Sequence, residues 1–345
     1  MISRHQRISY IFMLVVLLLV GWLHMATLLL TTLFGYLALR TFAFGRSRFF
    51  AVAVFSVLMV VVSVGVLHFG KKAYLTVPDI VDNTLPILDG LAHKFDLDIP
   101  FDNYKELVDF LKKESVGQYP SMENFKSLQG FLSTLIFQLV YLIIGAVVAV
   151  SLFFNSKIDM DSDPHSRRDS LYAMTAAEIF HRFRTFFASF RVVMGAQILI
   201  SFINSAATGC FLLLAGFPHA ILLTAITFAC GLLPIIGNLV SNSIIVCVGL
   251  SIPEKPHMAA IALGYLVVIH KGEYFLNSKI IGDRIKNPMW LTLIGLLIGE
   301  RLMGIPGMIL APVILHYIKV EMSKARVAGP GEVQEAGAVA PQAKG

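Results

Sequence analysis

Long apolar runs alternate with short polar segments along most of the chain. Four runs have the length of one membrane crossing, since about 20 helical residues span the hydrocarbon core of a bilayer. These runs are residues 49–70, 131–154, 191–215 and 258–276. The pattern predicts four full transmembrane helices.

Three further runs are roughly 30 residues long, which is too long for one upright helix and short for two full crossings with a turn. They are residues 8–39, 219–250 and 289–318. Each has helix breakers or polar residues near its middle, at Gly21–His24, Pro234–Asn238 and Gly304–Gly307 respectively. We expect each to form a helical hairpin, short or re-entrant. A tilted or kinked single helix is the alternative.

Composition agrees with this pattern. Apolar residues make up 56% of the 345 residues and charged residues 14%, with a mean hydropathy of +0.74. Soluble domains carry about 25% charged residues, so one aqueous core could not hide this much apolar surface. The sequence therefore predicts an all-α integral membrane protein, a multi-helix bundle whose first partner is the lipid bilayer.

The distribution of charged residues predicts how the chain is oriented in the membrane, and it does not indicate a nucleic-acid partner. The net charge is +6, but Lys and Arg are scattered between apolar runs instead of forming one basic stripe. With the N-terminus inside, 17 Lys and Arg fall on 92 predicted inner residues and 8 on 70 outer residues. The positive-inside rule then predicts cytoplasmic N- and C-termini.

The same pattern divides the chain into five parts. They are an N-terminal hairpin and first crossing (1–70), an extracytoplasmic helical cap (71–130), a crossing with a cytoplasmic amphipathic helix (131–190), a C-terminal core (191–320) and a disordered tail (321–345).

Common catalytic signatures do not occur. The chain has no GxxxxGK[ST], HExxH or GxSxG motif, and its three cysteines lack metal-ligand spacing. We therefore expect no enzyme activity, no metal site, no cofactor and no ATPase within the chain.

A break inside the second long run is the first candidate site. Pro234 and Gly237 interrupt the apolar residues, and Asn238 and Asn242 follow. Proline removes a helical hydrogen bond, and freed backbone groups inside lipid need protein or a water-filled cavity to satisfy them. Half-helix ends of this kind bind polar solutes or ions in transporters. A purely structural kink is the alternative.

Two further candidates carry charge. Glu273 lies near the end of a predicted crossing, where ionisable side chains are costly and often functional. An interfacial Glu that reaches water or pairs with Lys271 is the alternative.

Glu300 and Arg301 fall near the turn of the third long run, before Gly304, Pro306 and Gly307. Gly295 and Gly299 form a GxxxG that favours close helix packing.

Several short motifs resemble one known family in their order and spacing. They are residues 231–237 (GLLPIIG), Glu273, 279–282 (KIIG), 287–288 (NP) and 304–312 (GIPGMILAP). Together they resemble the autoinducer-2 exporter family of bacterial membrane transporters, also called the PerM or predicted permease family. The resemblance is strongest over residues 190–320. Asn277-Ser278 and Glu300-Arg301 depart from the common pattern, which weakens any transfer of substrate identity.

The resemblance implies secondary transport of a small polar solute, export of autoinducer-2 in some members, and assembly as a homo-oligomer. It also implies a location in the bacterial inner (cytoplasmic) membrane. A sodium(lithium)/proton antiporter is the first alternative, and a non-transporting membrane scaffold is the second. We expect the two broken hairpins, around Pro234–Gly237 and Gly304–Gly307, to share a solute or ion site with Asn238, Asn242 and Glu273.

Overall fold

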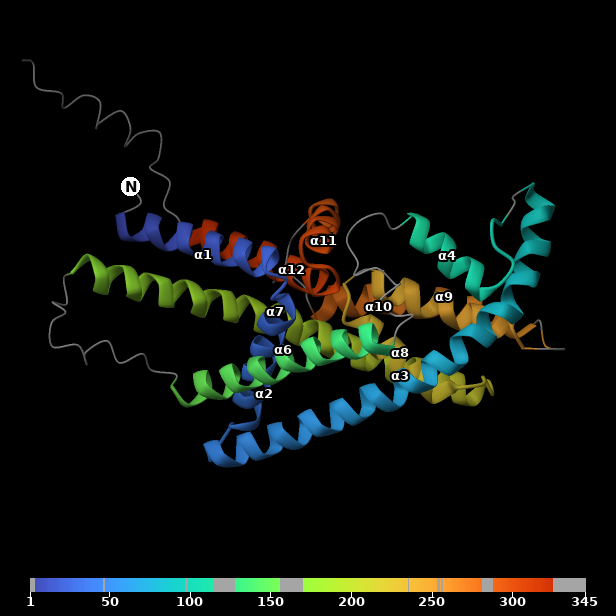
Figure 1. Ribbon diagram of the computed structural model, residues 1–345, viewed down its shortest axis with the longest axis horizontal. Helices are drawn as coiled ribbons and strands as arrows, with labels where there is room; N and C mark the ends of the chain where they lie inside the picture. The colour runs from blue at the N-terminus through green and yellow to red at the C-terminus, as the bar shows by residue number, and fades with distance from the viewer. Residues whose placement is uncertain are drawn as a thin grey trace, which may run out of the picture. The chain divides into compact units, whose positions relative to one another are not determined.

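All regular structure in the computed structural model is helical. Among the described residues there are eleven α-helices and one short 3₁₀ helix, and no strand (Figure 1). This confirms the all-α prediction. The described residues are 4–45, 47–96, 99–114, 128–155, 170–234, 236–252, 255, 257–280 and 288–324.

Four of the described helices are long and apolar enough to cross a membrane. They span Arg4–Trp22, Arg48–Gly90, Leu171–Leu214 and Ile305–Lys324. Their outer surfaces expose large apolar side chains such as Val60 and Leu67. Lipid tails are the medium in which such surfaces are stable, so the chain is an all-α membrane protein.

The four predicted crossings lie in helices, two of which are longer than expected. α6 (Leu128–Phe154) and α10 (His257–Ile280) match their apolar runs closely, whereas α3 (Arg48–Ala92) continues well past residue 70. α7 (Leu171–Leu214) joins its crossing to the segment expected as a separate amphipathic helix. No proline lies at either junction, near residue 70 or near residue 190, and Pro78 and Pro86 further along α3 do not end that helix. At 1.5 Å per residue each long helix extends about 66 Å, more than twice the hydrocarbon core.

The second and third long runs form packed helix pairs, which confirms their hairpin character. The pairs are α8 (Ala220–Gly231) with α9 (Ile236–Leu250), and α11 (Met289–Met303) with α12 (Ile305–Lys324). α12 is itself long enough to span a membrane. It continues to Lys324, so residues 321–324 are helical rather than part of a disordered tail. Residues 325–345 lie outside the described part of the chain.

The first long run is also divided near its predicted break. α1 (Arg4–Trp22) ends just before His24, whose φ of 53° lies in the left-handed region, and α2 (Ala26–Phe42) follows. The two helices belong to different compact units. Their pairing as a hairpin therefore stays a prediction.

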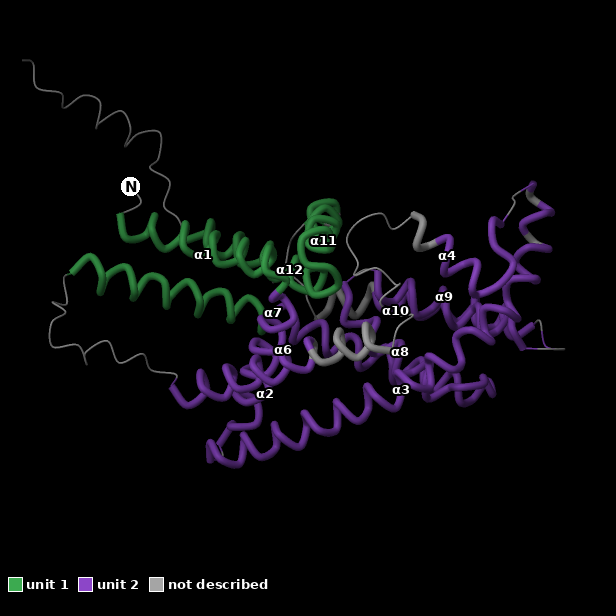
Figure 2. The backbone as a smooth tube through the Cα atoms, in the orientation of Figure 1, with its two compact units in different colours: residues 1–24, 157–192, 287–345 green, residues 25–156, 193–286 purple. Residues whose placement is uncertain are grey.

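The chain separates into two compact units (Figure 2). Unit 1 comprises residues 1–24, 157–192 and 287–345, which include α1, the N-terminal half of α7, α11 and α12. Unit 2 comprises residues 25–156 and 193–286. The boundary falls inside α7, between Val192 and Val193.

One core of unit 2 joins three helices. α2 packs against α6 and α3, with Leu39, Ala51, Phe55, Ala149 and Phe153 buried between them. The hydroxyl of Thr32 on α2 donates to the backbone oxygen of Gly145 on α6, 3.3 Å away. Such a polar contact between close helices is typical of membrane bundles.

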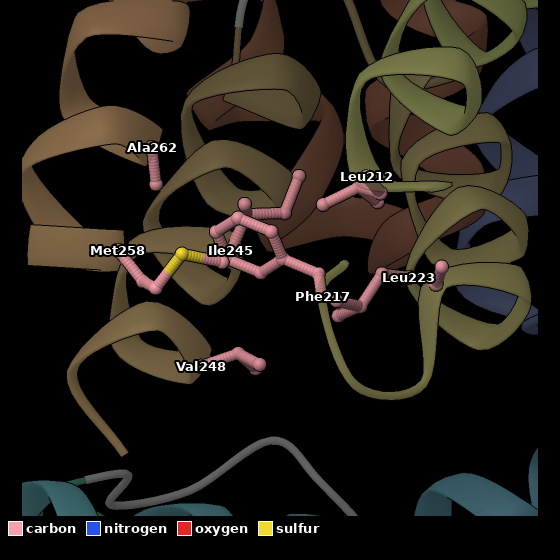
Figure 3. Close-up of a cluster of buried hydrophobic side chains, with 8 residues drawn as sticks. Leu212, Phe217, Leu223, Ile245, Val248, Met258 and Ala262 are labelled. Carbon is pink, nitrogen blue, oxygen red and sulfur yellow. The ribbon is translucent and has the colours of Figure 1, made fainter. Parts of the chain in front are cut away.

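A second core of unit 2 lies where α7 turns into α8 and where α9 turns into α10. Figure 3 shows the Phe217 ring among Leu212, Leu223, Ile245 and Met258, side chains from four different segments. Val248 and Ala262 complete the labelled cluster. This core joins the ends of α7 and α9 to the starts of α8 and α10 and so positions the α8–α9 hairpin.

The described part of the predicted cap is mostly helical. α3 carries Pro78 and Pro86 in this region, and the 3₁₀ helix His93–Phe95 and α4 (Tyr104–Glu114) follow. The carboxylate of Asp82 accepts a 2.7 Å hydrogen bond from the backbone N–H of Tyr104, which ties α4 back to α3. Residues 115–127 lie outside the described residues.

Candidate functional site

The α8–α9 hairpin is too short to cross a bilayer and return. Its arms have 12 and 15 residues, so they extend about 18 Å and about 22 Å, against a hydrocarbon core of about 30 Å. A hairpin of this length that enters from one surface ends inside the membrane. Its turn then needs polar partners from the protein.

Close backbone contact shapes the turn of this hairpin. Gly237 lies against the end of α8 so tightly that a Cβ atom there would fall 1.7 Å from the carbonyl oxygen of Cys230. Pro234 is half-buried beside it, and its carbonyl accepts a 2.7 Å hydrogen bond from the N–H of Ile236. The helix between Gly231 and Ile236 is therefore broken, as the sequence predicts, and glycine is required for the return.

A row of polar side chains on α7 faces this broken hairpin. Gln197, Ser201, Asn204 and Thr208 follow one another at intervals of three or four residues, and Ser205 is four residues after Ser201, so all lie on one face of the helix. The row comprises Gln197, Ser201, Asn204, Ser205 and Thr208. Ser201, Asn204, Ser205 and Thr208 are buried.

Two members of this row satisfy carbonyl groups at the end of α8. Ser201 Oγ donates to the backbone oxygen of Phe228 at 2.7 Å, and Gln197 Nε2 donates to that of Gly231 at 2.6 Å. The amide of Leu232 bonds to Ala229 instead of Phe228, so the Phe228 carbonyl has lost its helical partner. α7 thus supplies the polar partners that the break requires.

The centre of the row contacts a candidate from the sequence. Asn204 Nδ2 donates to Asn238 Oδ1 across 2.9 Å, and both residues are buried. Asn204 is 3% exposed, yet its side-chain oxygen has no hydrogen-bond partner. A buried acceptor without a donor is destabilising in an apolar surrounding, so this atom is ready to accept from a solute or water. Asn242 is buried one turn beyond Asn238.

The row ends at α10. Thr208 Oγ1 and the hydroxyl of Tyr265 lie 3.1 Å apart, and the Tyr265 ring stacks on Phe211. Ser205 donates back to the carbonyl of Ser201 within α7. Together these contacts give unit 2 a continuous polar seam between α7, α8, α9 and α10, which we call the α7 seam.

A cavity of about 460 Å³ opens at the other end of the hairpin. Charged and polar groups from α3 and the two turns line it, and Val248 and Met258 of the second core form part of its wall. His219, at the start of α8, has a φ of 55°. The polar lining residues are Thr76, Asp79, Asn83, His219, Ser251 and Lys255.

Glu273 lies apart from the α7 seam in its described contacts. It is on α10 with 14% of its side chain exposed, and its carboxylate lies 4.0 Å from the imidazole of His270 on the same helix. Among the described residues it makes no hydrogen bond to Asn238 or Asn242. Residues 281–287, which include the end of the motif at 279–282 and Asn287 of the motif at 287–288, lie outside the described part of the chain.

The third-run hairpin belongs to unit 1, so the α7 seam is described from unit 2 alone. Gly304, with a φ of 65°, ends α11, and Ile305, Pro306 and Gly307 open α12. The backbones meet at Gly299 and Gly307, where an added Cβ would fall within 2.5 Å or less of the facing carbonyl oxygen. This confirms close packing as the role of the GxxxG. Glu300 is half-buried and Arg301 exposed near the turn.

Unit 1 holds a buried ion cluster that the sequence did not single out. Arg182 of α7 forms ion pairs with Glu321 of α12 and with Glu178 one turn before it. The guanidinium carbon lies 4.1 Å from the ring centre of Tyr10, whose hydroxyl donates to Glu321. The sequence did not reveal this cluster because Arg182 has the pattern of a cation at the lipid head groups. Glu321 lies at the start of the predicted tail.

The α7 seam was missed for a different reason. Its residues are uncharged and fall inside a predicted crossing, where single Ser, Thr and Asn side chains commonly bond to their own helix. The signal was their spacing, because five polar residues on one face of an apolar helix indicate a polar surface opposite. In the part of the chain that the structure describes, no group of three or more His, Cys, Asp or Glu side chains is placed to hold a metal ion.

Comparison with known proteins places the chain in a protein family. Residues 5–326 match the family described as AI-2E family transporter. The "Putative transport protein YdbI" of Bacillus subtilis (strain 168) is 29% identical over 164 residues, which cover 45% of this chain and 47% of that protein. The chain thus spans about half the length of that curated relative. No solved structure matches.

Proposed function

The chain belongs to the AI-2E transporter family, and we propose that it works as a secondary transporter that exports a small polar solute, with autoinducer-2 as the first candidate. We place it in a bacterial inner membrane with cytoplasmic termini, where it assembles as a homo-oligomer. The α7 seam is the proposed route. Pro234, Gly237, Asn238 and Asn242 shape one side of it.

The unpartnered oxygen of Asn204 is the observation that carries this proposal. Transport through a membrane needs polar groups at depth whose partners are exchangeable. Most polar atoms at the hairpin break are already paired within the protein, which stabilises the fold, whereas Asn204 Oδ1 is not. A hydroxylated solute supplies the missing donor and, with its own oxygens, competes for the amide groups of Asn204 and Asn238.

The cavity beside α3 supports an outer opening of the same route. It adjoins the turns that begin α8 and end α9, whereas the break lies at the opposite ends of these helices. One arm length, about 18 Å, therefore separates the cavity from the break. Its mixture of carboxylate, imidazole, ammonium and amide groups suits a neutral polar solute better than an ion of either sign.

The test is a flux measurement with the full-length protein. Proteoliposomes loaded with autoinducer-2 are given a proton gradient or a sodium gradient, and efflux is followed. We expect gradient-driven efflux from the wild type and a reduction of roughly tenfold or more in Asn204→Leu, which keeps the volume and removes both polar groups.

Thr227→Val is the matched control. Thr227 is equally buried in the same hairpin, but its hydroxyl donates to Leu223 within its own helix. We expect near wild-type efflux from this variant. Equal loss in the two variants would assign the Asn204 effect to packing, and a wild-type rate in Asn204→Leu would remove the α7 seam from the route.

Sodium/proton antiport is the second candidate, because one observation favours it. Glu273 is largely buried on α10, with its carboxylate beside the imidazole of His270, and a buried carboxylate in a membrane helix suits alternating binding of a proton and a cation. A pH-sensitive dye inside the same proteoliposomes distinguishes the two functions. Proton movement driven by sodium or lithium alone, without solute efflux, would replace the exporter proposal.

A further inference from the structure

A second cavity, in unit 1, is lined by basic side chains and, among the described residues, by no acidic ones. It holds about 330 Å³ between residues 181–192 of α7 and the C-terminal part of α12. The ionisable side chains that line it are His181, Arg184, His316 and Lys324, and no carboxylate is among them. Arginine and lysine keep their charge at neutral pH, so the cavity is electropositive.

Two hydroxyl groups lie deeper in the same cavity. Thr185 accepts a hydrogen bond from Lys324 Nζ at 3.4 Å. Ser189, one turn further along α7, is 2% exposed, and its hydroxyl has no hydrogen-bond partner. A serine in a helix normally donates to a carbonyl of the preceding turn. An unsatisfied hydroxyl at the base of a basic cavity therefore points to an acceptor that enters from outside.

The acidic residues nearby are already neutralised. Both Glu178 and Glu321 form ion pairs with Arg182, and Glu321 also lies 3.6 Å from Lys324. Arg184 has no such partner among its described contacts and lies exposed at the cavity opening. An anion in the cavity thus meets Arg184 and Lys324 first and the hydroxyl groups behind them.

The surface beside the opening is apolar. Phe180 and Phe183 on the same stretch of α7 expose large parts of their rings. Aromatic and basic side chains on one helix are typical of the depth at which lipid head groups meet acyl chains. A free anion makes no use of the two rings, whereas an acyl chain packs on them.

We propose that this cavity binds the phosphate-bearing head group of an anionic membrane lipid. The lipid phosphate accepts hydrogen bonds from Arg184, Lys324 and Ser189, and its acyl chains lie along Phe180 and Phe183. Basic pockets between membrane helices bind head groups by this chemistry. The site belongs to unit 1 and is independent of the transport route proposed for unit 2.

Native mass spectrometry of the full-length protein, delipidated in a neutral detergent, tests the proposal. The probes are dioleoyl phosphatidylglycerol, dioleoyl phosphatidylcholine and inorganic phosphate. We expect phosphatidylglycerol to bind at least tenfold more tightly than phosphatidylcholine, whose choline opposes the basic lining, and millimolar phosphate not to displace it. Equal affinity for the two lipids would overturn the proposal. Displacement by phosphate would overturn the lipid assignment in favour of a soluble phosphate compound.

Variants locate the site. Arg184→Gln with Lys324→Gln should weaken phosphatidylglycerol binding by roughly tenfold or more. The matched control, Arg191→Gln with Lys319→Gln, removes the same charge from the same two helices outside the cavity lining. Equal weakening in both pairs would mean general surface attraction and would overturn the site.

Ser189→Ala changes no charge and removes only the unpartnered hydroxyl. We expect roughly threefold weaker phosphatidylglycerol binding, with unchanged binding of phosphatidylcholine. Unaltered phosphatidylglycerol affinity would exclude the phosphate from the base of the cavity and contradict the assigned geometry. Because the comparison of lipids on the wild type needs no variant, a variant that fails to fold leaves the main test intact.

Discussion

Arg182 illustrates how much of this protein depends on single buried side chains. Its guanidinium is enclosed by two carboxylates, the ring of Tyr10 and the hydroxyl of Ser9. These groups come from α1, α7 and α12, so one residue links three helices of unit 1. A buried charge is tolerated only while such partners remain.

Glu321→Gln should therefore destabilise unit 1. The change keeps the shape of the side chain but leaves Arg182 with one charged partner, and breaking a buried ion pair costs on the order of 3 kcal/mol. We expect a lower midpoint of thermal unfolding in detergent. Glu178→Gln is the control, because Glu178 is more exposed and lies on the same helix as Arg182. Equal midpoints for the two variants would contradict a special role for Glu321.

Glu273 gives the sharpest residue-scale test of the antiport alternative. Glu273→Gln keeps the volume and removes the charge, so a carboxylate that binds a proton or cation loses its function. Cation-coupled flux should fall to background while expression and oligomer size stay unchanged. The measurement is the proteoliposome assay with the pH-sensitive dye. A wild-type rate would leave Glu273 as an interfacial anchor beside His270.

At the scale of elements, the α8–α9 hairpin combines a local break with a distant partner. Pro234 and Gly237 open the helix, and the polar face of α7 satisfies the groups that the break releases. The hairpin is stable inside the membrane only as part of this arrangement, because neither short arm shields the turn alone.

Gly237→Ala should disrupt this arrangement. The new methyl group would meet the Cys230 carbonyl at 1.7 Å, and separating the two backbones costs on the order of 3 kcal/mol. We expect a lower midpoint of thermal unfolding and reduced solute efflux. Gly264→Ala on α10 is the control, since its added Cβ meets nothing within 4 Å. That substitution should be neutral or stabilise by up to about 1 kcal/mol. If both variants behave alike, the close approach is not important.

At the scale of the whole molecule, the positive-inside count predicts opposite sides for residues 71–130 and 155–190. In a chain whose Cys210, Cys230 and Cys247 are replaced by serine or alanine, single cysteines at Ser121 and Ser166 report the two sides. An impermeant thiol reagent added to intact cells should label the first and spare the second. Labelling of both from outside would reverse part of the topology.

The sequence by itself determined that this protein folds in lipid and that its secondary structure is helical. Apolar runs of about 20 residues are stable only in lipid, where helices satisfy every backbone group internally. The breaks at Pro234 and Gly304 were also readable, because proline and glycine act on the backbone locally and need no distant partner.

Only the tertiary structure decided which polar faces meet. The pair of Asn204 with Asn238 joins residues 34 positions apart, and the pair of Arg182 with Glu321 joins residues 139 positions apart. Helical spacing indicates which side chains share a face, as for the α7 seam, but not which face of another helix lies opposite. That choice depends on how all helices of a unit pack at once. It made Ser189 the base of a cavity and left Asn204 Oδ1 without a donor.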